Sequence, residues 1–102
     1  MTVTRGSTAT HYFEVPYDRT QISAARVSYT QNGEVIILKK GDQIEVSDGL
    51  VLWRLSQEDT LSLQADAFVG VQMKLLIQPG EVDITEKAKL YVLNCEDDEV
   101  MV

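Results

Sequence analysis

The chain contains very few of the residues that build disulfides and metal sites: one cysteine, Cys95, and one histidine, His11, among 102 residues. A single cysteine excludes an internal disulfide, so packing alone must hold the fold together. No His/Cys cluster has zinc spacing, and the two residues lie too far apart in sequence to suggest a nucleophile with its base. We therefore interpret Cys95 as a small, half-buried residue at a strand end and His11 as a structural strand residue.

Long hydrophobic runs are also missing. No apolar stretch approaches the roughly 18 residues that a transmembrane helix needs. The opening segment, Met1–Gly6, lacks the apolar core of a signal peptide. We expect neither a membrane partner nor secretion by a signal peptide.

Basic residues are scarce, with 9 lysines and arginines against 16 acidic residues and a formal net charge of -7. This balance disfavours nucleic acid as a partner, because phosphate neutralisation needs a basic face. The acids do not converge either. Glu58 and Asp59 are neighbours on a short helical turn and diverge, and the four acids of Glu96–Glu99 are typical of a solvated C-terminal tail, at about 96–102. The sequence predicts no catalytic residue, no cofactor and no metal ligand.

Because no acidic residues have the spacing of metal ligands, we predict that metal ions do not affect the stability of the protein. Thermal melts recorded with EDTA and with excess calcium are expected to coincide. A ligand that binds only the native state must raise the melting midpoint, so a calcium-dependent rise of many degrees would contradict this prediction.

The sequence does contain segments in which apolar and polar residues alternate, as in β-strands with one buried face. Val51, Trp53 and Leu55 share one face of a strand, and five apolar residues alternate strictly from Val69 to Ile77. Between them, Ser56–Leu61 begins with a hydroxyl that can cap a helical turn and places acids at its positive end. A strand joined to a long strand through one helical turn is a common crossing between the sheets of a β-sandwich.

Period-two windows bounded by turn signals recur along the whole chain. Seven are expected to be strands: Ser7–Val15, Ile22–Gln31, Glu34–Lys40, Gln43–Val46, Leu50–Leu55, Phe68–Ile77 and Glu86–Leu93. Asn32-Gly33 predicts a type I′ turn between the second and third strands. The sequence thus predicts one all-β domain over residues 1–102, a seven-stranded immunoglobulin-like β-sandwich with one helical turn between the fifth and sixth strands. A small open barrel is the alternative.

The alternation also separates core from surface. The expected core comprises Val27, Tyr29, Trp53, Leu55, Val71, Met73, Leu75 and Leu90. Leu52 and Leu76 face outward, and with Tyr12 and Tyr91 they are the candidate interface residues. The first and last windows, near Thr8–Phe13 and Lys87–Val92, are the expected sheet edges, where another chain can pair. The tyrosines admit a second interpretation, as a platform on which sugars stack.

Several motifs carry a family resemblance. Thr4–Thr8, followed by the aromatic strand Tyr12–Val15, resembles the Arg-Gly-[Asp/Ser/Thr]-Thr opening of small prophage-encoded structural proteins of Gram-positive bacteria. Tyr29–Gly33, Leu55–Leu61 and Val69–Lys74 are similar to their later elements F-x-Q-x-G, L-[ST]-Q-E-[DE]-T-L and V-x-[VI]-Q-[LM]-[RK]. The resemblance covers nearly the whole chain and extends to the immunoglobulin-like N-terminal domain of phage upper baseplate proteins.

This resemblance implies a non-enzymatic phage or prophage structural or assembly protein, associated with a tail or baseplate. Its partners would be other phage structural proteins or further copies of itself. It would reside in the virion after assembly in the bacterial cytoplasm. The family supplies no catalytic residues. The alternative is a small module that binds carbohydrate or a host protein.

Overall fold

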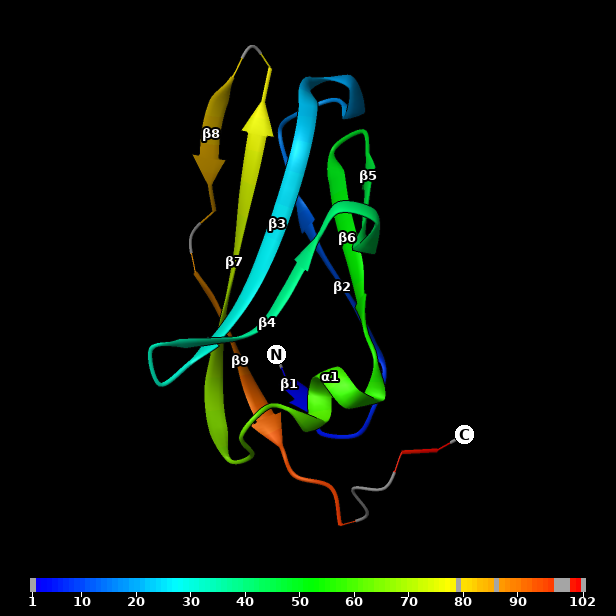
Figure 1. Cartoon of the computed structure of the whole chain (residues 1–102), viewed down its shortest axis with the longest axis vertical. Helices are drawn as coiled ribbons and strands as arrows, with labels where there is room; N and C mark the ends of the chain where they lie inside the picture. The colour runs from blue at the N-terminus through cyan, green and yellow to red at the C-terminus, as the bar shows by residue number, and fades with distance from the viewer. Residues whose placement is uncertain (1, 79, 86, 97–99, 102) are drawn as a thin grey trace.

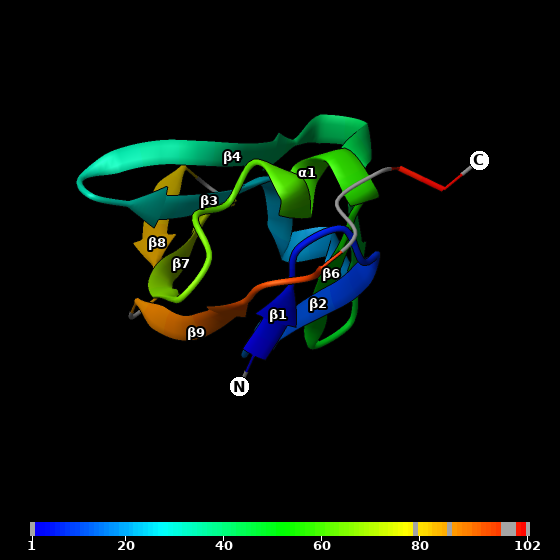
Figure 2. The same ribbon diagram turned by 90° about the horizontal axis from the view of Figure 1, so that it is seen from below.

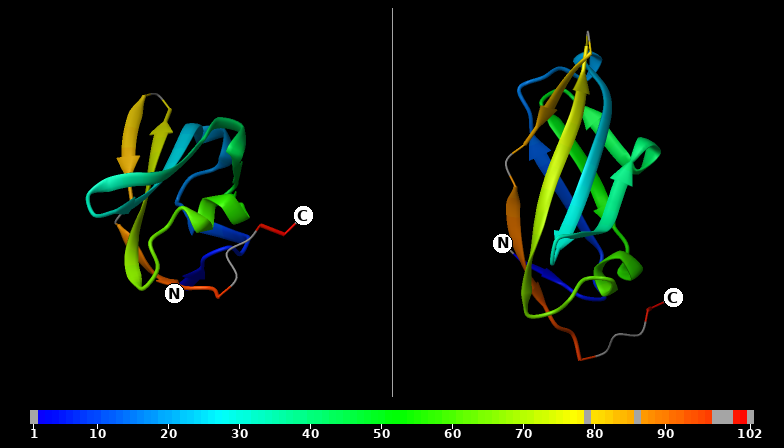
Figure 3. Two further views of the ribbon diagram at one scale, coloured as in Figure 1. Left: turned by 60° about the horizontal axis from the view of Figure 1, so that its bottom comes forward. Right: turned by 60° about the vertical axis from the view of Figure 1, so that its left-hand side comes forward.

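A computed structural model describes residues 2–78, 80–85, 87–96 and 100–101. Two sheets pack face to face as a β-sandwich (Figures 1 and 3). The larger sheet has the order β1 (Thr2–Thr4), β9 (Ala88–Leu93), β7 (Ala67–Ile77), β3 (Ile22–Gln31) and β4 (Glu34–Lys40), with β8 (Glu81–Ile84) pairing the other half of β7. The smaller sheet is β2 (Ala9–Glu14), β6 (Leu50–Leu55) and β5 (Ile44–Ser47).

The strand order confirms the predicted fold class. β2-β6-β5 corresponds to strands B, E and D of an immunoglobulin-like sandwich, and β9-β7-β3-β4 corresponds to G, F, C and C′. All seven expected strands are present within a few residues of their predicted ends. The strands form two separate sheets, so the fold is a sandwich and not the small open barrel that the sequence also allowed. Within the described residues, no helix is both long and apolar enough to cross a membrane.

Two further strands, β1 and β8, were not predicted. β1 is only three residues long and pairs in parallel with Tyr91–Leu93 of β9. The sequence around β8 reads as an acidic loop, but its backbone pairs with Lys74–Ile77 of β7. β1 depends on pairing with a strand far along the chain, which a local pattern does not reveal. β8 instead returns along β7 in a tight hairpin, in which Ile77 pairs with Glu81.

The predicted core is correct. All eight of the expected residues are buried, and Trp53 and Tyr29 are the largest fully buried side chains. They come from β6 and β3, so the two sheets interdigitate at this point. The expected edges are half right. β2 pairs only with β6 and is an edge, but β9 lies between β7 and β1.

Local signals explain the turns. Asn32 and Gly33 both have positive φ, 53° and 77°, as a type I′ turn between β3 and β4 requires. The helix α1 (Gln57–Leu61) begins after Ser56, whose hydroxyl accepts a hydrogen bond from the Asp59 amide, while Asp59 accepts one from the Ser56 amide. This capping box confirms the predicted helical turn. Figure 1 shows α1 at one end of the sandwich, and Figure 2 looks onto that end.

Candidate protein-interaction surfaces

The structure places the four predicted interface residues on two different surfaces. Tyr12 of β2 and Leu52 of β6 are register partners on the outer face of the three-stranded sheet. Leu76 of β7 and Tyr91 of β9 point outward from the six-stranded sheet. Because the two outer faces point away from each other, these residues form two pairs. Tyr12 and Leu76 are exposed, at 62% and 39%, whereas Leu52 and Tyr91 are half-buried.

We call the outer face of the six-stranded sheet face A. It carries an unusual number of exposed apolar side chains: Val35, Leu38, Phe68, Leu76, Val82, Ile84 and Leu93. Phe68 is 62% exposed, and its ring meets that of Tyr91 edge to face with centroids 5.2 Å apart. Scattered apolar residues need no explanation, but a face that gathers so many is typical of a contact surface.

Face A is also where the chain's scarce cations gather. Five of the nine basic residues belong to it: Arg26, Lys40, Lys74 and Lys89 from the strands, and Lys87, whose side chain lies over Gly70 of β7. Among the described residues that alternate outward on these strands, none is acidic. Gly70 leaves room for the Lys87 side chain, because a Cβ at Gly70 would lie only 2.8 Å from the aliphatic carbons of Lys87. Lys87 therefore lies flat across β7.

A shallow hollow on face A combines both characters. Its volume is about 300 Å³, and its lining is Arg26, Ser28, Val35, Leu38 and Lys74. Two cations beside two aliphatic side chains suit a carboxylate that is flanked by apolar groups. Sequence reasoning missed this hollow, because β3, β4 and β7 become neighbours only through the sheet order.

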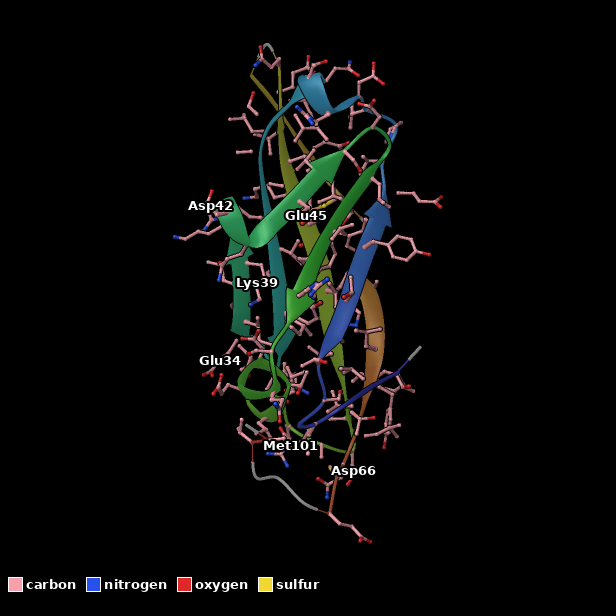
Figure 4. All side chains as sticks on the ribbon, turned by 90° about the vertical axis from the view of Figure 1, so that its right-hand side faces the viewer. Glu34, Lys39, Asp42, Glu45, Asp66 and Met101 are labelled. Atoms are coloured by element: carbon pink, nitrogen blue, oxygen red, sulfur yellow. The ribbon has the colours of Figure 1, made fainter. Side chains whose placement is uncertain are left out.

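The outer face of the three-stranded sheet, face B, has the opposite charge character. Glu14 of β2 and Glu45 of β5 point outward beside Tyr12 and Leu52, and Arg54 is the one basic residue among the described outward side chains of these strands. A hollow of about 190 Å³ on this side is lined by Asp42, Gln43, Glu45, Leu52, Trp53 and Arg54. Figure 4 looks onto this side and labels Asp42 and Glu45.

Between the sheets, a cleft of about 500 Å³ opens beside α1 and contains an ion pair. Lys39 donates to Asp59 at 2.7 Å, and both side chains are largely buried. Burial opposes ionisation of Asp59, but the hydrogen bonds from Lys39 and the Ser56 amide outweigh it and lower the pKa of the carboxyl. Since its bonds fix Asp59 in the helix cap, we assign this pair a structural role.

The histidine lies in a buried hydrogen-bonded chain. Trp53 donates its indole N–H to the Tyr29 hydroxyl at 2.7 Å, and that hydroxyl contacts Nδ1 of His11. Because tryptophan can only donate, the Tyr29 hydroxyl accepts from Trp53 and keeps its own proton to donate. Donation of that proton to Nδ1 of His11 satisfies both groups when the imidazole carries its proton on Nε2. His11 is thus a structural residue in this arrangement. Burial raises the pKa of Tyr29, which keeps its hydroxyl protonated.

This chain makes stability pH-dependent. Burial lowers the pKa of His11 below its ordinary 6.5. As pH falls below that value, the unfolded chain gains a proton that the folded chain resists, so the free energy of unfolding decreases until the folded pKa is reached. Urea melts at about pH 7.5 and about pH 5 should show this loss, and a His11→Asn variant, which keeps an acceptor but cannot titrate, should lose less. Parallel losses in the two proteins would contradict the assignment.

The four tyrosines do not form one platform. Tyr29 is fully buried, and Tyr17 donates to Asp83 at 2.8 Å near one end of the sandwich. Tyr12 and Tyr91 lie on opposite outer faces. Among the described residues, no three His, Cys, Asp or Glu side chains gather as a metal site would require. Most of the predicted acidic tail, including residues 97–99, lies outside the described part of the chain.

Two motifs of the family resemblance, the Arg-Gly opening and the helical element, meet at α1. The Gly6 amide donates to the Thr60 hydroxyl at 2.9 Å, and that hydroxyl lies 2.8 Å from the Ser7 carbonyl. Arg5 donates to the Leu61 carbonyl at 3.0 Å. These contacts join the Arg-Gly opening to the helical element, so both motifs serve the fold.

The F-x-Q-x-G element, Tyr29–Gly33, is also hydrogen-bonded to the segment that follows α1. The buried Gln31 side chain makes two hydrogen bonds with the backbone of Gln64, at 2.7 and 3.0 Å.

No protein family model, curated protein or solved structure matches this chain.

Proposed function

We propose that this chain is a non-enzymatic structural or assembly protein of a phage or prophage, associated with a tail or baseplate and acting through protein–protein contacts. The observation that supports the contact role is face A, where exposed apolar side chains and five cations lie together and the described outward strand residues include no acid. The phage context rests on the motif resemblance. In this proposal the protein resides in the virion after assembly in the bacterial cytoplasm.

Particle composition tests the proposal. We expect the chain to co-sediment with phage particles induced from the source bacterium, as detected with an antibody to the chain. Leu76→Lys, which places a charge on face A, should reduce its incorporation, because an apolar contact is replaced by a solvated cation.

Glu58→Gln changes the charge by the same amount on the exposed surface of α1 and serves as the control. A protein absent from purified particles would overturn the phage proposal. Equal incorporation of the two variants would remove face A from the contact.

A carbohydrate- or host-protein-binding module is the second candidate, and the pair formed by exposed Phe68 and half-buried Tyr91 favours it, because sugars stack on such rings. Glycan binding that is lost in Phe68→Ala would support this alternative over assembly.

A further inference from the structure

We propose that copies of this chain associate head to tail, with face A of one copy against face B of the next. This inference deepens the proposed assembly role by naming the partner of face A. It starts from the uneven distribution of charge. Five of the nine basic residues belong to face A, which leaves four for all the other surfaces against 16 acids.

Face A cannot pair with a second face A. A two-fold interface brings the same patch of both subunits together. Here that arrangement would place the cations of Arg26, Lys74 and Lys89 opposite an identical set, and like charges across an interface cost several kcal/mol. The occupant of face A must therefore present acids together with apolar groups.

Face B presents that combination. Glu14, Glu45 and Asp42 supply three carboxylates against the single cation of Arg54. Tyr12 and Leu52 supply apolar surface between them.

The two hollows are matched in chemistry. Arg26 and Lys74 flank Val35 and Leu38 on face A, whereas Asp42 and Glu45 flank Leu52 on face B. In this contact, Leu76 and Tyr91 lie on face A of one copy, and Tyr12 and Leu52 lie on face B of the next.

The geometry sets the outcome of this association. Face A and face B lie on opposite sides of the sandwich, so two joined copies still present one free face of each kind (Figure 3). Such heterologous contacts continue into a stack or close into a ring, according to the rotation between neighbours. The contact also has a defined salt response, because screening weakens attraction between exposed opposite charges.

Sedimentation velocity of the purified chain tests this inference. We expect oligomers at about 0.02 M salt that dissociate towards about 0.5 M salt. Lys74→Glu and Glu45→Lys each remove complementarity from one face, and each should weaken association by about tenfold or more. An equimolar mixture of the two variants restores opposite charges at every contact, so it should associate again.

The net charges of the variants make this test specific. Glu45→Lys changes the charge from -7 to -5, so reduced general repulsion alone would strengthen its association. The contact between faces A and B predicts the reverse. Glu58→Lys makes the same charge change on α1, away from both faces, and should associate as the wild type does. Thermal melts show whether all variants fold.

Three results would overturn the inference: a strict monomer at low salt, association that strengthens with salt, or equal behaviour of Glu45→Lys and Glu58→Lys. A monomer that nevertheless enters phage particles would leave the proposed function standing, with a different protein on face A.

Discussion

Replacing Trp53 by alanine is expected to lower the free energy of unfolding by about 3–5 kcal/mol. Trp53 is the largest fully buried side chain, and it packs against Phe13 of the same sheet with ring centroids 5.6 Å apart. The truncation leaves a cavity between the sheets and removes the donor to Tyr29. Since small domains have only about 5–15 kcal/mol of stability, this loss removes a large share of the total.

Urea or thermal unfolding followed by circular dichroism measures this effect. Trp53→Phe is the matched control, because it retains most of the buried ring and loses only the indole N–H. It should lose clearly less stability than the alanine variant. An alanine variant within about 1 kcal/mol of the wild type would contradict the central position of Trp53 in the core.

Thr60→Val is expected to cost about 1–3 kcal/mol, although its shape is nearly unchanged. Thr60 is fully buried and its hydroxyl joins the Gly6 amide to the Ser7 carbonyl. Valine removes the hydroxyl and leaves these backbone groups without that partner. The expected result is a lower melting midpoint with an unchanged fold.

Thr60→Ser provides the comparison, because it keeps the hydroxyl and deletes one buried methyl group, at about 0.8 kcal/mol. The serine variant should therefore be more stable than the valine variant. The opposite order would show that packing of the methyl group, and not the bond to the N-terminal segment, holds α1 in place.

The sequence predicts most of this fold because its signals are local. The alternation around Trp53 and Val71, the Asn32-Gly33 turn and the Ser56 cap each determine a short segment. β1 lacks such a signal, because its strand conformation depends on a partner in β9 that only the folded sheet supplies. In β8, Val82 and Ile84 do alternate with Glu81 and Asp83, but the window is only four residues long and half acidic, so the pattern does not identify it as a strand.

The interaction surfaces were predictable only in part, for the same reason. Period two identifies Leu52 and Leu76 as outward residues, but it does not say which outward residues share a face. The net charge of -7 predicts that salt should promote association by screening repulsion. The sheet order instead collects cations on face A, and the contact proposed between faces A and B predicts the opposite salt response.

The parallel pairing of β1 with β9 has a consequence for synthesis of the protein on the ribosome. Thr2–Thr4 pairs with Tyr91–Leu93, so β1 has no partner until Leu93 has been translated. At elongation rates of about 5–20 residues per second, β1 waits several seconds. During that delay the Arg-Gly opening can already dock on α1 through Thr60, because α1 emerges much earlier than β9. That early docking would hold the N-terminal segment near the site of its final strand.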